Sequence, residues 1–164
     1  MQLAKPRIDV GLRTNRPEEH LRLWAETLQL PYVTQIQISA KHVQHRFHAN
    51  GSILKINCFT DPLPTAPSGS GYREVLIARA GLATPLHLQD PDGSLVTLVP
   101  HGFEGIHQLG VRLVVRDLTV HRNFFGKTLA IPEEQPGRFR AGETLFILEQ
   151  GRPVSLAARS SLTR

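Results

Sequence analysis

The chain has 164 residues, 40% hydrophobic and 20% charged, which is ordinary for a globular protein with one core or two small ones. Its formal net charge of +5 comes from 19 Lys and Arg residues scattered singly along the chain, without a basic cluster or a nucleic-acid-binding module, so we expect no nucleic-acid partner. No segment approaches the roughly 20 apolar residues that span a bilayer, no leader pattern is recognisable and Cys58 is the only cysteine, so we expect a cytoplasmic protein without a membrane anchor.

The first part of the chain reads as a strand, a helix and three more strands. Ile8, Val10 and Leu12 alternate with polar or small residues, which is the period of a half-buried strand. Pro17 followed by two glutamates is typical of the first turn of a helix. Asn50-Gly51 suits a type I′ hairpin turn, because both residues tolerate positive φ. The three further strands are expected at Tyr32–Ser39, His42–Ala49 and Ser52–Phe59.

A segment with several prolines and glycines, Asp61–Gly71, separates this part from the rest and is interpreted as a linker. Beyond it we expect short strands, a turn at Asp90-Pro91-Asp92-Gly93, and then a second strand–helix pair that begins at Leu109. The remaining strands are expected at Arg73–Arg79, Leu86–Gln89, Leu95–Val99, Leu109–Leu113 and Leu145–Glu149, with a further one around Arg138–Ala141.

The strongest pattern in the sequence is an internal repeat. Asp9–Pro31 aligns without a gap with Gly110–Pro132, and both copies read as a strand followed by a helix. Such a repeat predicts an architecture of similar modules. The identical pairs are Val10/Val111, Leu12/Leu113, His20/His121, Thr27/Thr128, Leu28/Leu129 and Pro31/Pro132.

The repeat and one turn together resemble a known superfamily. Units of β-α-β-β-β order, with Asp90-Pro91-Asp92-Gly93 and the strand that follows it, resemble the vicinal-oxygen-chelate proteins: glyoxalase I, bleomycin-resistance proteins and extradiol dioxygenases. The resemblance covers nearly everything from Arg7 to Gln150. It implies an α+β fold in which paired βαβββ modules form an open, cup-shaped mixed sheet.

The chain offers three units where two complete cups would need four. Residues 1–104 are interpreted as one paired cup domain with an abbreviated second unit. Residues 105–164 are interpreted as the start of a second repeat that is truncated, so that the third module is incomplete or unpaired. The segment Val154–Arg159 is only faintly similar to Val75–Arg79. Because an unpaired sheet edge exposes backbone donors and acceptors, we predict a homodimer.

The resemblance also implies inward positions, on the first and last strands of each unit, that commonly hold a divalent metal with His and Glu side chains. By register these positions fall on Asp9, Lys55, Glu74 and Thr97. A lysine ammonium has no lone pair to donate, so this set does not match a metal site. We therefore expect no metal or other cofactor, and hypothesise an internal salt-bridge cluster with Lys55 in the place of the metal. The alternative is that the charged residues only hold the sheets together.

The hairpin turn predicts which side chains accompany Lys55. It places Arg46 opposite Lys55, and residues two apart on each strand share that face. If Lys55 faces the cup, the pocket is rich in hydrogen-bond donors and suits a carboxylate, a phosphate or a polarised carbonyl. The alternative for Arg46 is a place at the solvent edge. The predicted ligand-binding residues are Gln44, Arg46, His48, Asn57 and Thr97.

Two other constellations are set aside. His42, His45 and His48 cannot converge on one metal, because residues three apart on a strand point to opposite faces. Cys58 lacks the flanking signature of a nucleophile, and we expect it to pack in the core.

Three functions are compatible with these features. The first is a glyoxalase-like lyase, isomerase-like or dioxygenase-family enzyme acting on a small oxygenated, anionic compound without the usual metal. In it Lys55 would polarise a carbonyl, and Asp9 or Glu74 would move a proton. The second is a non-catalytic binding or sequestering protein of the resistance type. The third is a degenerate scaffold that serves dimer formation, since a fold does not by itself establish a function.

Overall fold

The protein is an α+β structure built on two open mixed sheets. The structure is a computed structural model and describes residues 6–64 and 71–152. Sheet A has the order β1–β4–β3–β2, in which β1 runs parallel to β4 and the other neighbours are antiparallel. Its strands are β1 (Val10–Thr14), β2 (Tyr32–Ser39), β3 (His42–Ala49) and β4 (Ser52–Phe59).

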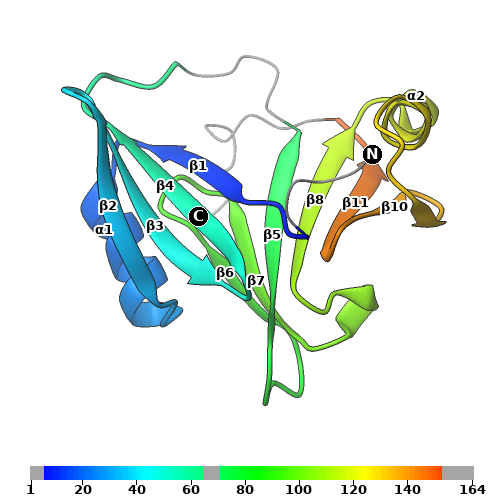
Figure 1. Ribbon diagram of the computed structural model, residues 1–164, viewed down its shortest axis with the longest axis horizontal. Helices are drawn as coiled ribbons and strands as arrows, with labels where there is room; N and C mark the ends of the chain where they lie inside the picture. Colours follow the sequence, from blue (N-terminus) through cyan, green and yellow to red (C-terminus); the bar gives the residue numbers. More distant parts are fainter. Residues whose placement is uncertain (1–5, 65–70, 153–164) are drawn as a thin grey trace, which may run out of the picture.

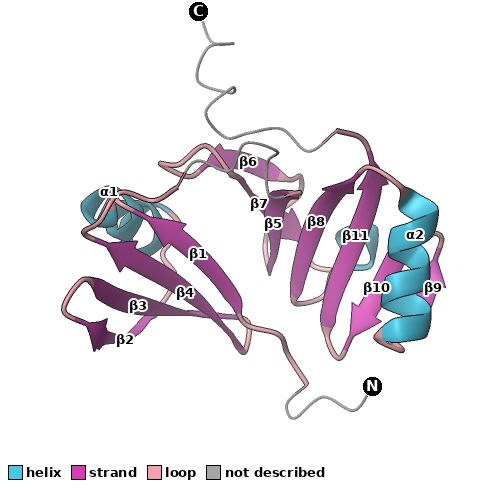
Figure 2. Cartoon of the chain, turned by 90° about the horizontal axis from the view of Figure 1, so that it is seen from above, coloured by secondary structure: helices cyan, strands magenta, loops and turns pink. Residues whose placement is uncertain are grey.

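Sheet B has the order β6–β7–β5–β8–β11–β10–β9 and occupies the other lobe of the molecule (Figures 1 and 2). Parallel pairs join β5 to β7 and β8 to β11, while β5 and β8 are antiparallel to each other. Its strands are β5 (Tyr72–Arg79), β6 (Leu86–Gln89), β7 (Leu95–Pro100), β8 (Leu109–Val115), β9 (Glu133–Gln135), β10 (Arg138–Ala141) and β11 (Thr144–Gln150).

The described residues form three repeat units, and two of them have a helix. In unit one, α1 (Pro17–Leu21) continues as the π-helical segment η1 (Arg22–Thr27). In unit three, α2 (Leu118–Asn123) continues in the same way as η3 (Phe124–Thr128). Unit two runs directly from β5 to β6 and β7. Units one and three therefore have the predicted β-α-β-β-β order, unit two is abbreviated, and the predicted α+β class with open mixed sheets is confirmed. The expectation that the third module is incomplete or unpaired was wrong, because its strand β8 pairs with β5 and its strands follow the complete order.

The units pair differently from the expected arrangement of the first with the second. β5 of unit two pairs with β8 of unit three, so these two units share sheet B, and unit one forms sheet A by itself. The short connection between β7 and β8, which includes the single turn η2 (Phe103–Gly105), brings β8 back beside β5. Val75 and Val111 face each other across that pair, so both strands bury the same apolar side. The pairing therefore joins strands from both sides of residue 104, the boundary predicted from the sequence between two parts of the chain.

A shared apolar core joins the two sheets. In β1 and β4 alternate side chains are buried, as expected for strands with one covered face. Trp24 and Leu28 from the first helical segment are almost fully buried in the same cluster, which extends to Val75 and Ile77 of sheet B. A separate cluster lies where Phe125 packs against β10 and β11. No helix among the described residues is long and apolar enough to cross a membrane.

A buried histidine links the first helix to the Asp-Pro-Asp-Gly turn. Trp24 donates its indole N–H to Nδ1 of His20 at 3.1 Å, so the Nε2–H of His20 donates to Oδ2 of Asp92 at 2.9 Å. Burial raises the pKa of Asp90, which caps the turn through the backbone N–H groups of Asp92 and Ser94. Hydrogen bonds from His20 and Thr14 outweigh burial at Asp92 and lower its pKa.

A polar junction fixes sheet A against sheet B. Gln108, 4% exposed, donates to the backbone oxygen of Ala49 at 3.2 Å and to the hydroxyl of Ser52 at 2.6 Å, and it accepts from Thr144 at 3.2 Å. Asn50 at the hairpin tip donates to the backbone oxygens of Ala78 and Gln108 at 2.6 and 3.1 Å. These bonds connect all three units.

We expect Gln108→Leu to lower the free energy of unfolding by about 1–3 kcal/mol, because the substitution leaves buried acceptors without their partner. Urea denaturation measures this change. Gln35→Leu makes the same chemical change at an exposed position of β2 and should alter stability by less than about 0.5 kcal/mol. Equal effects of the two substitutions would contradict a structural role for the junction.

Candidate functional site

One face of sheet A carries four of the five predicted ligand-binding side chains, all except Thr97. The register of β3 with β4 pairs Arg46 with Lys55, Gln44 with Asn57 and His48 with Ile53, as the turn predicted. The helix α1 and the shared core cover the opposite face, where Leu54 and the residues two apart from it are buried. The side chains that share the free face, called here the polar face, are Asp9, Arg13, His42, Gln44, Arg46, His48, Lys55 and Asn57.

Asp9 and Lys55 form an ion pair on this face. Nζ of Lys55 lies 2.8 Å from Oδ2 of Asp9, and the other carboxylate oxygen accepts from the backbone N–H of Ile53 at 3.1 Å. The lysine side chain is 30% exposed and the aspartate 15%. The ammonium therefore has a fixed position and remains accessible.

A hydrogen-bonded relay orients Arg46 beside this pair. Nε of Arg46 donates to Gln44 at 2.7 Å, and the Gln44 amide donates to Oδ1 of Asn57 at 2.8 Å. Asn57 in turn donates to the backbone oxygen of Leu12 at 3.0 Å, and His42 also bonds Oδ1 of Asn57 at 3.0 Å. The two terminal amino groups of Arg46 make no hydrogen bond within the described part of the chain. These amino groups can therefore donate hydrogen bonds to a ligand next to Lys55.

A cleft of about 450 Å³ adjoins the polar face, between β1 and sheet B. Apolar side chains such as Leu12, Val111 and Phe146 form most of its wall. Asp9 lies in its lining and also binds Lys55, so the cleft and the ion pair meet at this residue. The other polar residues of the lining are Arg13, Tyr72, Asp90, Asp92 and Ser94.

Glu74 and Thr97, the other two residues of the predicted cluster, lie on sheet B instead. Oγ1 of Thr97 donates to Glu74 in a short hydrogen bond, so Nδ1 of His87 donates to Thr97 at 3.0 Å. Nε of Arg112 lies 2.9 Å from Oε2 of Glu74. The predicted group of four is therefore divided into Asp9–Lys55 on sheet A and Thr97–Glu74 on sheet B, because unit two pairs with unit three.

Arg112 is the residue of this cluster that sequence reasoning missed. Besides Glu74, its guanidinium makes a short ion pair with Glu149 and lies 3.4 Å from Glu104. Burial opposes the charge, but Glu149 and Glu74 hold the pKa of Arg112 above its ordinary value. An arginine inside the apolar run of β8 was a signal that the sequence did contain. Together these side chains form a polar belt across five neighbouring strands, from β6 to β11: His87, Thr97, Glu74, Arg112 and Glu149.

The residues present do not fit the divalent metal that the resemblance implies. In sheet B the inward positions on the first and last strands of its two units hold Glu74, Thr97, Arg112 and Glu149. A guanidinium has no lone pair for a metal, and it already engages both carboxylates. Within the described ranges, no three His, Cys, Asp or Glu side chains come together as a metal-binding group.

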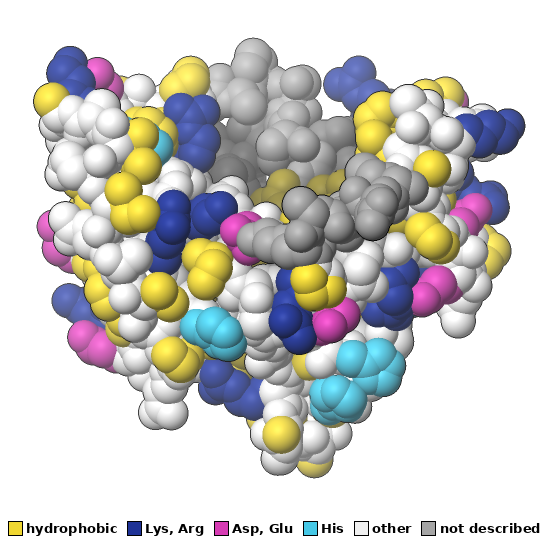
Figure 3. All heavy atoms as spheres, in the orientation of Figure 1, with side chains coloured by type: hydrophobic (Ala, Val, Ile, Leu, Met, Phe, Trp, Pro, Cys, Tyr) yellow, Lys and Arg dark blue, Asp and Glu magenta, His cyan; other side chains and the backbone are white. Residues whose placement is uncertain are grey.

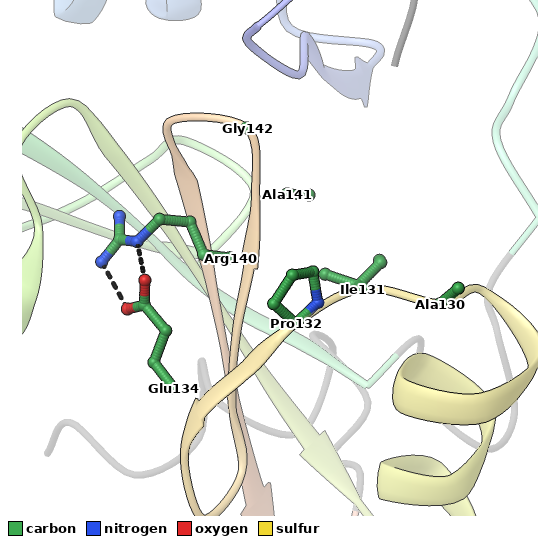
Figure 4. A pocket seen from close by; sticks show the side chains of 7 residues that line it. All are labelled: Ala130, Ile131, Pro132, Glu134, Arg140, Ala141 and Gly142. Atoms are coloured by element: carbon green, nitrogen blue, oxygen red, sulfur yellow. Dashed lines mark hydrogen bonds and ion pairs between the residues drawn. The ribbon is translucent and has the colours of Figure 1, made fainter. Parts of the chain in front are cut away.

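Two further features carry no candidate chemistry. A hollow of about 320 Å³ lies beside β10, where Arg140 and Glu134 satisfy each other at 2.8 Å (Figure 4). The thiol of Cys58 is buried, and burial together with the charges of Glu18 and Asp92 raises its pKa to about 11. It therefore stays protonated at neutral pH, as expected for a packing cysteine.

Comparison with known proteins identifies the fold. No family model matches the sequence, and no curated protein matches it. Two mutant crystal structures of glyoxalase I from Zea mays match with TM-scores of 0.64 and 0.63, at 12% and 14% sequence identity. Each match covers 89% of this chain, and 68% and 67% of the maize chains. The chain therefore has the fold of glyoxalase I.

Arg112→Met should lower the free energy of unfolding by about 3–5 kcal/mol at neutral pH, because it leaves the buried carboxylate of Glu74 without its counter-ion. Glu74→Gln added to that variant should recover part of the loss. Arg140→Met removes a more exposed ion pair and should cost about 1 kcal/mol or less. Chemical denaturation of the four proteins tests this, and similar losses in the two arginine variants would refute it.

Proposed function

We propose that the protein binds a small, oxygenated, anionic molecule on the polar face of sheet A, without a metal. The observation that supports this most strongly is the pair of unoccupied terminal amino groups on Arg46, which the Gln44 relay orients beside Lys55. Arginine binds carboxylate or phosphate oxygens with two parallel hydrogen bonds, and lysine adds a point charge.

The distribution of charge supports an anionic ligand. The polar face holds Arg13, Arg46 and Lys55 but only one carboxylate, that of Asp9. In Figure 3, Lys and Arg side chains gather near the middle of the lobe that contains sheet A, whereas basic and acidic side chains alternate over the other lobe. The cleft that begins at Asp9 offers the apolar part of such a ligand a wall formed by Val111 and Phe146.

Chemistry on the bound molecule is one form of this proposal. Lys55 would polarise a carbonyl or stabilise an enolate, and Asp9 at 2.8 Å is the nearest carboxylate to take up a proton. Glu74 is engaged by Arg112 on the other sheet, so Asp9 is favoured for that role. The second form is sequestration without turnover, which needs the same donors but no base. Maize glyoxalase I shares the fold alone and does not decide between the two forms.

Lys55→Met and Arg46→Gln should each weaken binding of a small dianion about 10- to 100-fold, which corresponds to the loss of one charged hydrogen bond. Isothermal titration with malonate and with inorganic phosphate provides the measurement. Lys41→Met is the matched control, because Lys41 lies in the turn between β2 and β3 and pairs with the exposed Asp61. It should leave the affinity unchanged.

Activity and binding measurements on the wild type and on Asp9→Asn distinguish an enzyme, a sequestering protein and a scaffold. Turnover of a carbonyl acid that disappears in Asp9→Asn while binding persists would support an enzyme. Tight binding that survives in Asp9→Asn without any turnover in the wild type would support sequestration. Absence of thermal stabilisation by any acid or phosphate would refute the proposed ligand class and leave the scaffold.

We further propose that the protein forms a homodimer through the free edge of β2. This strand is eight residues long, carries no charged side chain and exposes about half of the side chains of Val33 and Ile38. A long uncharged edge strand with exposed apolar residues is typical of a surface that pairs with another strand.

The double substitution Val33→Lys and Ile38→Lys should convert a dimer to a monomer in sedimentation at micromolar concentration, because charges on the edge oppose pairing. Val120→Lys, at an exposed position of α2, is the control and should leave the dimer intact. A monomeric wild-type protein under these conditions would refute the proposal.

A further inference from the structure

The polar belt of sheet B is built like a site for a cation. Its central carboxylate, Glu74, is 8% exposed and receives a hydrogen bond from Thr97 on one side and the guanidinium of Arg112 on the other. Glu149 and Glu104 approach the same guanidinium from β11 and from η2. Three carboxylates from separate elements thus converge on one positive group.

The positive group at this position is a side chain of the protein itself, the guanidinium of Arg112. Oxygen ligands of this kind suit hard divalent cations, and carboxylates set affinity through their number and charge. In this belt each of the three carboxylates already accepts a hydrogen bond from an N–H group. A metal ion would therefore be repelled by the charge of Arg112 and would find no carboxylate without a partner. Arg138 adds to this charge balance, because it pairs with Glu104 at 3.1 Å.

We propose that Arg112 takes the place of the divalent metal in the cup of units two and three, so that this cup operates without a metal and accepts one only when the guanidinium is removed. The inference concerns sheet B and does not depend on the ligand proposed for sheet A. In this proposal the internal cation of the paired units is Arg112, whereas the sequence predicts Lys55 in that role. The four positions that carry it are Glu74, Thr97, Arg112 and Glu149.

The position of the arginine distinguishes this proposal from a salt bridge that only holds the sheet together. Arg112 and Glu74 are opposite each other in the register of β8 with β5, where the two units meet. Glu149 and Glu104 are 42% and 31% exposed, and removal of the guanidinium would leave the Glu149 carboxylate without its arginine partner while Glu104 keeps its pair with Arg138. A merely structural bridge would lose stability on substitution without gaining affinity for a metal.

The test is to titrate Mn²⁺ into the wild-type protein and into Arg112→Ala, with electron paramagnetic resonance and thermal shift as readouts. We expect Arg112→Ala to bind one Mn²⁺ at least about ten-fold more tightly than the wild type does, and to gain thermal stability on binding. Glu74→Gln in the same variant should abolish the gain. Arg112→Lys keeps a positive charge in the cup and should bind no more metal than the wild type.

Arg140→Ala is the matched control, because it frees the single carboxylate of Glu134 and should create no metal site. Equal Mn²⁺ affinity in the wild type and Arg112→Ala, or a folded Arg112→Ala that binds none, would overturn the proposal. If Arg112→Ala does not fold alone, the bulkier Arg112→Gln replaces it. Folding of either variant only with Mn²⁺ supports the proposal, and a folded Arg112→Gln without affinity overturns it.

Discussion

The arrangement of this protein depends on the buried junction around Gln108. The amide side chain of Gln108 connects the hairpin of unit one to β11 of unit three, and Asn50 at the tip of the hairpin connects it to Ala78 of unit two. Hydrogen bonds are directional, whereas the apolar core beside them is not, so the junction sets how sheet A inclines toward sheet B. The cleft along β1 lies between the two sheets that the junction connects, and Asp9 belongs both to its lining and to the polar face.

The two sheets carry similar polar groups, but the charged side chains are paired more completely on sheet B than on sheet A. On sheet B, Arg112 is surrounded by acceptors, and the buried charges there satisfy one another, as the burial of ionised groups demands. On sheet A, Lys55 pairs with the single carboxylate of Asp9, while Arg46 donates only to the amide oxygen of Gln44 within the described residues. A charge that is fully paired inside the protein has little left for a ligand. This difference in charge pairing supports the proposed binding of a small molecule on sheet A rather than on sheet B.

Local features of this fold were predictable from the sequence, and long-range pairing was not. Alternation and the Asn50-Gly51 turn determine the strands and the register of β3 with β4, because a two-residue turn leaves a hairpin no freedom to slip. The choice of β8 as the neighbour of β5 depends instead on which of several apolar strand edges meet in three dimensions. That choice gave Glu74 the partner Arg112, where sequence reasoning had offered Lys55. The polar face was thus predictable within one hairpin, and the polar belt, which crosses five strands, was not.

The repeat explains why Arg112 is surrounded by carboxylates whereas Lys55 remains accessible. In unit one, Gly11 on the first strand is paired with Lys55 on the last. In unit three the aligned position holds Arg112, and its neighbour on the last strand is Ile147. Each unit thus places one cation at the same level of its sheet, but on opposite strands. Unit two adds Glu74 beside Arg112, whereas among the described strands β1 has β4 as its only neighbour. The donors around Lys55 stay available because no other unit supplies the carboxylate that would occupy them.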